Sequence, residues 1–265
     1  MRVMIAIPCS FALLLALPAL ARATTQTWLV TRALCEVGEL KFGMQTPIGQ
    51  GLKSGGASSW LATAAGIGSV ALHLFLAATD RPASWYDAVA VFATLATTGI
   101  AVTRRDAASF GFRLSPLQGW AYWAATAFVL VGLMGLVYWV TMLWVLGQSI
   151  PAGMLPIWDT TQIWPAFLWM CVQAPLWEEP VYRLALCPPL VARLGPAAAI
   201  VVGGILFFIP HVLWGVAGIN NFVGGFVLAW AYLKSGTIAV PIALHALGNF
   251  CIFAIQVALF YCYHA

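Results

Sequence analysis

Long apolar stretches separated by short polar ones dominate the chain. A helix that spans a membrane needs roughly 20 mostly apolar residues, and eight stretches approach or exceed that length. They cover residues 3–20, 60–79, 86–103, 118–146, 163–187, 197–214, 219–234 and 238–262. Their apolar residues run continuously and do not alternate with polar ones, which disfavours a β-barrel. The pattern predicts an all-α fold, a polytopic transmembrane bundle of about 7–8 membrane helices.

Two of these stretches differ from the rest. The seventh is short and contains Gly224 and Gly225, so we expect a tilted or partial span. The first follows Met1-Arg2 and ends before Ala21-Arg22-Ala23, which resembles a secretory signal peptide with a small-residue cleavage site. Cleavage there would place residues 24–59 outside the cell.

Composition and charge favour an uncleaved membrane protein. The chain is 62% hydrophobic and 8% charged, whereas a soluble domain is about 45–50% apolar and about 25% charged. One assignment of sides puts ten basic residues in the cytoplasm and leaves only Arg2 and Arg81 outside, as the positive-inside rule requires. The ten are Arg22, Arg32, Lys41, Lys53, Arg104, Arg105, Arg113, Arg183, Arg193 and Lys234. We therefore predict a multi-pass protein of the cell inner membrane, with the first helix retained and most Lys/Arg-bearing loops cytoplasmic.

Other kinds of site find little support. The 6 cysteines are scattered and form no Cys-x-x-Cys pair, so neither a disulfide framework nor a thiolate zinc site is indicated. The basic residues are dispersed and form no stripe, which argues against a nucleic-acid partner. Composition therefore leaves the lipid bilayer as one predicted partner.

Two adjacent glutamates interrupt the fifth apolar stretch, in the segment Ala174-Pro-Leu-Trp-Glu-Glu-Pro-Val-Tyr-Arg183. A carboxylate at membrane depth costs several kcal/mol unless it is paired or faces water, so the default interpretation is a functional site. The alternative is a helix-terminal pair that faces the cytoplasm. The flanking residues Trp177, Val181 and Tyr182 argue against that alternative.

Spacing separates the two glutamates. Glu179 and Arg183 are four residues apart, which favours an ion pair along a helix and leaves Glu178 as the free carboxylate. Adjacent helical residues point about 100° apart, so we do not expect both glutamates to face one cavity. Pro180 has no N–H and deprives the Leu176 carbonyl of its helical partner. A kink or local opening there would admit water.

Three polar residues follow in later apolar stretches. His211 ends the segment Phe207-Phe-Ile-Pro-His211, and His245 and Asn249 share one helix face. A carboxylate with a histidine can deprotonate water, and a histidine with an asparagine amide can stabilise an oxyanion. These are the parts of a hydrolase that works without a covalent intermediate. His73 matches no motif and is interpreted as a packing residue.

Three motifs occur in order: Glu178-Glu179-x-x-x-Arg183, Phe207-x-x-x-His211 and His245-x-x-x-Asn249. Over residues 118–255 the chain resembles the CAAX protease and bacteriocin-processing (CPBP) family, intramembrane glutamic endopeptidases related to the type II CAAX prenyl endopeptidase. Leu184 departs from the family, in which glycine often follows the arginine. The resemblance divides the chain into N-terminal helices with a cytoplasmic loop, residues 1–117, and a protease core, residues 118–262.

The resemblance implies roles for these residues. Glu178 would activate water with help from His211, while His245 and Asn249 would form the oxyanion hole. Glu179, Arg183 and Phe207 would support the site, which would lie in a conical cavity between the later helices and need no metal cofactor. The substrate would be a membrane-associated protein or peptide, cut near its C-terminus or membrane-proximal region. Family substrates include prenylated proteins, peptide precursors and C-terminal sorting signals.

Three alternatives remain open from the residues. The two histidines and Glu178 could bind zinc, although no His-Glu-x-x-His motif is present. The same fold could serve a catalytically silent binding or immunity protein. The glutamates could also form a proton relay in a transporter, but the chain lacks the repeated half-domains typical of such proteins.

Overall fold

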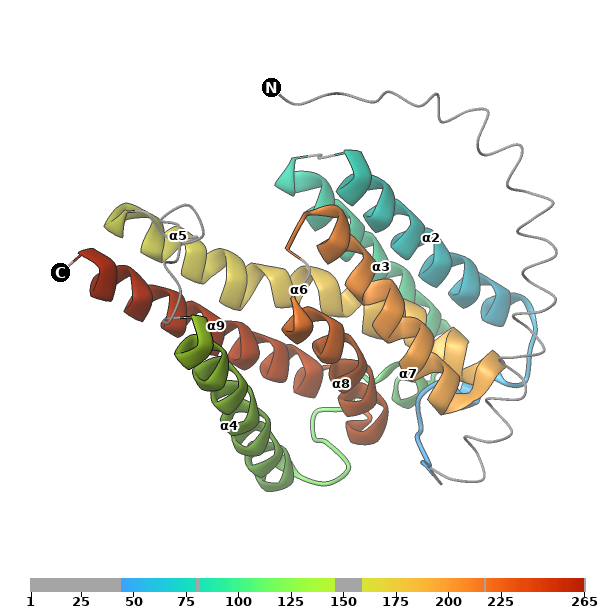
Figure 1. Cartoon of the computed structure of the whole chain (residues 1–265). Helices are drawn as coiled ribbons and strands as arrows, with labels where there is room; N and C mark the ends of the chain where they lie inside the picture. The colour runs from blue at the N-terminus through green and yellow to red at the C-terminus, as the bar shows by residue number, and fades with distance from the viewer. Residues whose placement is uncertain (1–43, 80–81, 146–158, 217, 265) are drawn as a thin grey trace, which may run out of the picture.

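The computed structural model describes residues 44–79, 82–145, 159–216 and 218–264, and these ranges contain helices and loops but no strand (Figure 1). The all-α prediction is therefore confirmed. The first predicted helix, residues 3–20, and the question of its cleavage lie outside the described residues.

The long helices match the apolar stretches to within a few residues at most ends. They are α2 (Ala57–Thr79), α3 (Ala83–Arg104), α4 (Trp120–Val145), α7 (Cys187–Leu213), α8 (Ile219–Ser235) and α9 (Ala239–His264). The short elements are η1 (Gln50–Leu52), η2 (Ala108–Phe110), η4 (Thr160–Gln162), α5 (Ile163–Phe167), η5 (Leu168–Gln173), α6 (Ala174–Glu179) and η6 (Pro180–Leu186). Asp159 caps η4 by accepting a hydrogen bond from the Thr161 backbone N–H, which lowers the pKa of the Asp159 carboxyl.

Five stretches among the described residues are long and apolar enough to cross a membrane. They are Ala57–Thr79, Ser84–Arg104, Trp120–Val137, Thr160–Leu213 and Ala239–Ala258. Helix α8, with 17 residues, is shorter than the others, as its sequence predicted. The total number of membrane crossings stays a prediction.

The break between the fifth and sixth predicted helices lies later than the sequence suggested. We expected the fifth helix to end at residue 187, but helical structure continues to Gly195, where φ is 83° and ψ is 168°. Only glycine adopts that conformation readily. Pro196 follows directly, and proline suits the first turn of a new helix. The change of direction therefore depends on a Gly-Pro step and not on the end of an apolar stretch.

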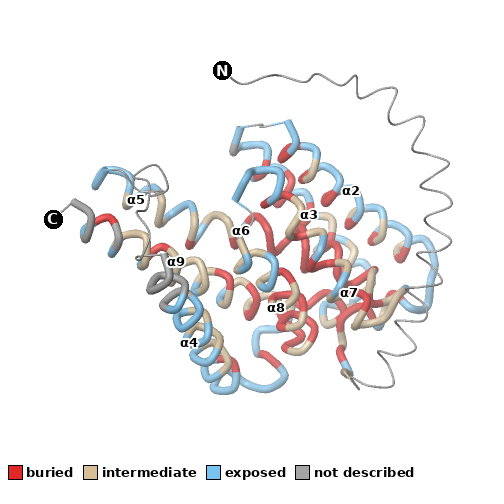
Figure 2. Tube along the Cα trace, in the orientation of Figure 1, coloured by how far each residue is buried: buried red, intermediate tan, exposed pale blue. Residues whose placement is uncertain are grey.

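The most buried part of the molecule lies where α2, α3, α6, α7 and α8 meet, whereas α4 is largely exposed (Figure 2). Small residues allow the close contacts that membrane helices use to associate. A Cβ atom on Gly225 of α8 would lie 2.7 Å from the carbonyl oxygen of Gly204 on α7. A Cβ atom on Gly66 of α2 would lie 2.5 Å from the carbonyl oxygen of Ala185 on η6. Helix α2 is thereby held against the helical run that carries the glutamates.

Several basic side chains gather around the start of α2. Arg104 donates hydrogen bonds to the Gly51 carbonyl and to Ser58. Arg193 donates from Nε to Thr63 Oγ1 at 3.1 Å. Arg104 and Arg193, from distant segments, therefore share one end of the bundle, as the positive-inside assignment requires of these two residues. Which side of the membrane that end faces remains a prediction.

Candidate active site

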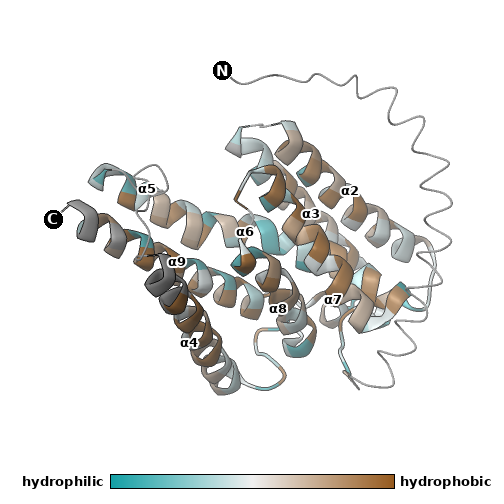
Figure 3. Ribbon diagram, viewed as in Figure 1, coloured by the Kyte–Doolittle hydropathy of each residue, from teal (hydrophilic) through white to brown (hydrophobic). Residues whose placement is uncertain are grey.

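The helical run from α5 to α7 changes its hydrogen-bonding pattern on both sides of the glutamates. Two π-helical segments, η5 and η6, flank the short α6. Pro175 lies at the start of α6 and Pro180 begins η6. Neither proline has an N–H to donate, and π-helical segments occur frequently at functional sites. The irregularity predicted at Pro180 is present as the π-helical segment η6. Figure 3 shows that the chain is hydrophilic beside α6.

The π-helical pattern of η5 leaves the Met170 carbonyl without its usual helical donor, and the predicted site residue Asn249 binds it. The Ala174 N–H donates to the Trp169 carbonyl and not to that of Met170. The next residue, Pro175, has no N–H to offer. Asn249 Nδ2 on α9 instead donates to the Met170 carbonyl at 2.7 Å. This bond joins α9 to η5, and the second amide hydrogen of Asn249 remains to serve another acceptor.

Glu179 is fully buried and binds two partners. Its Oε2 lies 3.0 Å from Arg183 Nε, so the ion pair predicted from the spacing is present. Its Oε1 lies 2.9 Å from His245 Nδ1. Arg183 is also fully buried, and its guanidinium carbon lies 4.8 Å from the centre of the Phe207 ring. A cation over an aromatic face gains further electrostatic stabilisation.

Glu178 faces the two histidines. Its Oε2 lies 4.0 Å from Nε2 of His211 and 4.0 Å from Nε2 of His245. These separations exceed a direct hydrogen bond and suit a small bridging group. Both glutamates therefore approach His245, from opposite edges of its ring. The two carboxylates meet different ring nitrogens and have different further partners, His211 for Glu178 and Arg183 for Glu179. That they do not share one cavity stays a prediction.

The hydrogen bonds of the two histidines fix which ring nitrogen carries a proton. The Phe207 carbonyl lies 3.0 Å from His211 Nδ1 and can only accept, so Nδ1 donates and Nε2 of the neutral ring presents a lone pair to Glu178. His245 Nδ1 lies 2.9 Å from Glu179 Oε1, whose other carboxyl oxygen is paired with Arg183, so Nδ1 likewise donates. Nε2 of His245 can therefore donate to an oxyanion only when that ring carries both protons.

Six of the seven predicted site residues form one contact cluster: Glu178, Glu179, Arg183, Phe207, His211 and His245. Asn249 lies one helical turn from His245 and is fixed through Met170. His73, interpreted from the sequence as a packing residue, lies beside the cluster: its ring centre is 5.4 Å from that of Tyr182 in η6.

Comparison with known families covers the part of the chain that carries this cluster. Residues 160–251 match the model of the type II CAAX prenyl endopeptidase Rce1-like family. The chain carries an Rce1-like domain. No curated protein and no solved structure matches the chain. The resemblance predicted from the three motifs is thus confirmed, and the match contains all seven predicted site residues.

The Rce1-like domain supports an intramembrane endopeptidase of the CAAX type, that is, a protease. Together with the apolar helices it indicates a multi-pass membrane protein. Proteases of this family act on protein substrates in a membrane. Helices α2, α3 and α4 lie outside the matched residues, although α2 and α3 share a hydrophobic core with η6 and α7.

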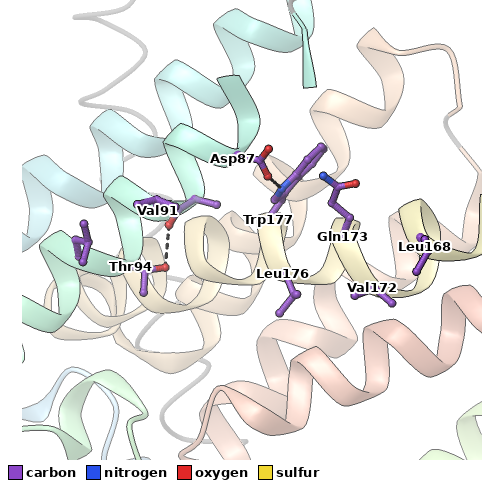
Figure 4. Close-up of a pocket in the computed structure, with 10 residues that line it drawn as sticks. Asp87, Val91, Thr94, Leu168, Val172, Gln173, Leu176 and Trp177 are labelled. Atoms are coloured by element: carbon purple, nitrogen blue, oxygen red, sulfur yellow. Dashed lines mark hydrogen bonds between the residues drawn. The ribbon is translucent and has the colours of Figure 1, made fainter. Parts of the chain in front are cut away.

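A groove of about 650 Å³ lies between α3 and the start of the Rce1-like domain (Figure 4). Its walls are mostly apolar, and Asp87, Thr94 and Gln173 supply polar groups. Trp177, the residue before Glu178, donates a hydrogen bond from its indole to Asp87. The groove thus reaches the helix that positions Glu178.

Proposed function

We propose that the chain is an intramembrane endopeptidase that hydrolyses a peptide bond with water activated by Glu178 and His211. The observation that carries the proposal is the position of Glu178 Oε2, 4.0 Å from Nε2 of both His211 and His245 at a buried site. A carboxylate between two imidazole nitrogens is suited to proton transfer.

The hydrogen-bond directions suggest a sequence of proton transfers. Water between Glu178 and His211 gives a proton to Glu178 while its oxygen attacks the scissile carbonyl. The developing oxyanion accepts hydrogen bonds from Asn249 and from doubly protonated His245. The C–N bond then breaks, and Glu178 returns the proton to the leaving amine. No covalent enzyme intermediate is formed.

Glu179, Arg183 and Phe207 act indirectly in this proposal. Glu179 orients His245 through Nδ1. Arg183 balances the charge of Glu179, and the Phe207 backbone carbonyl fixes the orientation of His211. These residues place the two Nε2 atoms toward Glu178.

The substrate is proposed to be a membrane-associated protein or peptide, cleaved near its C-terminus or in a membrane-proximal region. Glu178 lies in a mostly apolar helical run, so the bond to be cut must reach it from a segment held at the bilayer. The mostly apolar groove beside Trp177 offers such a segment a path toward Glu178. The proposed setting is the cell inner membrane, with the Lys/Arg-rich end of the bundle in the cytoplasm.

The first test replaces Glu178 by glutamine in the native host and maps protein termini in the membrane and secreted fractions. Loss of a general base typically costs about 10²–10⁴ in rate, so a defined set of cleaved termini should disappear while the level of the variant stays normal. Asp159→Asn is the matched control, because Asp159 is exposed and remote from the cluster. An unchanged set of termini in the Glu178→Gln strain would favour a silent binding or immunity protein.

A zinc-dependent protease is the second candidate, because Nε2 of two histidines and Oε2 of Glu178 face one another. Zinc binds such ligands at about 2.0–2.2 Å. Within the described ranges, no three such side chains are arranged as a metal site, so they would have to move together. We expect purified enzyme to keep its activity after exhaustive chelation. Activity that is lost on chelation and restored by zinc would reassign the histidines and Glu178 as ligands.

A further inference from the structure

Helix α2 lies outside the family match, yet it brings a buried histidine to the site. Gly66 allows α2 to approach Ala185 of η6, and His73 follows two helical turns later on the same face. His73 is buried, with 3% of its surface exposed. A titratable group held so deeply in an apolar helix calls for a partner or a function.

Aromatic rings connect His73 to the proposed catalytic machinery. The His73 ring centre lies 5.3 Å from Tyr86, 5.4 Å from Tyr182 and 5.7 Å from Trp214. The Trp214 ring lies 5.5 Å from that of His211, and the Tyr182 ring lies 5.4 Å from that of Phe207. His73 is therefore one ring away from two motif residues, on the His211 side of Glu178.

Packing alone does not account for the polar atoms here. His73 Nδ1, Tyr182 Oη and Glu178 Oε2 are all buried and have no hydrogen-bond partner among the described residues. Leaving such a group unpaired is costly, and buried polar groups in native proteins are nearly always hydrogen-bonded. Phenylalanine would fill the same aromatic cluster without that cost. The polar atoms of His73 and Tyr182 are better explained by a partner that arrives with the reaction.

We propose that His73 and Tyr182 bind the backbone of the substrate next to the scissile bond, on the side of His211. This inference rests on the proposed function, because it assigns a subsite to the same active site. A polypeptide offers one N–H and one C=O per residue, and consecutive residues of an extended chain are about 3.3–3.6 Å apart. A bound substrate therefore supplies polar groups to neighbouring positions at once. The rings of Tyr86 and Trp214 would cover the bound segment.

The test uses the full-length enzyme and a peptide that spans a cleavage site mapped from the Glu178→Gln strain. His73→Asn places an amide where Nδ1 lies, His73→Gln places it where Nε2 lies, and His73→Phe keeps only the ring. We expect His73→Phe and His73→Gln to raise KM about tenfold, the order expected for one hydrogen bond. Their kcat should change little. His73→Asn should restore much of the binding. Tyr182→Phe should also raise KM.

A second measurement separates binding from chemistry and from stability. Peptide affinity is measured in the inactive Glu178→Gln background, with and without His73→Phe, and the thermal midpoint of each variant is recorded. We expect weaker binding with a midpoint that is equal or higher, because phenylalanine removes an unpaired buried polar atom. If His73→Phe binds and turns over the peptide as the parent does, or if all three His73 variants lose stability with no rescue by asparagine, His73 is a packing residue and the inference is wrong. If Glu178→Gln alters no terminus, the proposed function fails and this subsite fails with it.

Discussion

Helix α4 and the helical run from α5 into α7 are both strongly apolar, yet they occupy opposite situations in the molecule. In the apolar part of α4, 6% of the residues are buried inside the protein, whereas in the apolar part of the run 39% are buried. Helix α4 contains no charged residue, and Figure 3 shows it brown, that is hydrophobic, along much of its length. The run carries Glu178, Glu179 and Arg183 at its most buried point.

The difference shows that hydropathy indicates which segments enter the bilayer, whereas packing indicates which of them lie at the centre of the protein. Hydropathy selects the segments that enter the bilayer, and Phe128 of α4, 81% exposed, satisfies that requirement by facing lipid. Lipid tails are as apolar as leucine, so helices associate through close packing and hydrogen bonds and not through hydrophobicity. The least apolar residues of an apolar stretch therefore indicate which helix lies at the centre.

Arg183→Met gives the largest expected effect in this comparison. If apolar character alone stabilised the run, as in α4, removing a buried charge would stabilise the protein. The structure instead pairs Arg183 with the buried Glu179 at 3.0 Å, and breaking a buried pair costs about 3–5 kcal/mol. We expect a large fall in the free energy of unfolding and in protein level, measured by denaturant unfolding in detergent.

The control is Arg193→Met. Arg193 is exposed, donates to Thr63 and lies 4.1 Å over the Trp60 ring. An exposed cation–π contact is worth about 0.5–1 kcal/mol, so the loss should be small. Equal losses in the two variants would show that the centre of the run depends on apolar packing as much as on the ion pair.

Features that depend on neighbouring residues along the chain were predictable from the sequence. The helix ranges follow from continuous apolar stretches, and the Glu179–Arg183 pair follows from a spacing of four. The motifs also gave the members of the cluster. Three features depend on residues far apart in sequence and were not predictable from local rules: the Glu179–His245 hydrogen bond, the Asn249–Met170 hydrogen bond and the approach of His73 to Tyr182. The break at Gly195 falls within the predicted gap of residues 188–196, but the helical structure before it extends beyond the predicted end at residue 187.

Asn249→Ala should have the next largest effect, and on turnover more than on binding. Losing one oxyanion donor typically costs about 10²–10³ in kcat. Asn249→Asp should be at least as damaging, because it presents a carboxylate to the developing negative charge and to the Met170 carbonyl. Rates are compared at equal amounts of folded enzyme, since the Met170 carbonyl also loses its donor.

Thr126→Ala is the control for Asn249→Ala, because it removes a polar group from α4. Thr126 Oγ1 donates to the Tyr122 carbonyl one turn earlier, at 2.9 Å. Its loss should leave kcat unchanged. A turnover loss for Thr126→Ala as large as that for Asn249→Ala would mean that α4 takes part in catalysis and that the contrast between the two regions is false.

The smallest expected effect compares one glycine from each region. Gly225→Ala would place a Cβ 2.7 Å from the Gly204 carbonyl oxygen and 3.2 Å from Phe207 Cδ1, so α8 would have to move away from α7 beside the site. Overpacking of this kind costs about 1–3 kcal/mol. Gly132 of α4 has no atom within 4 Å of the corresponding position, and alanine is the better helix former by about 1 kcal/mol. We therefore expect Gly225→Ala to lower the thermal midpoint and Gly132→Ala to leave it equal or slightly higher. A midpoint lowered equally by both substitutions would mean that Gly132, like Gly225, is closely packed against another part of the protein.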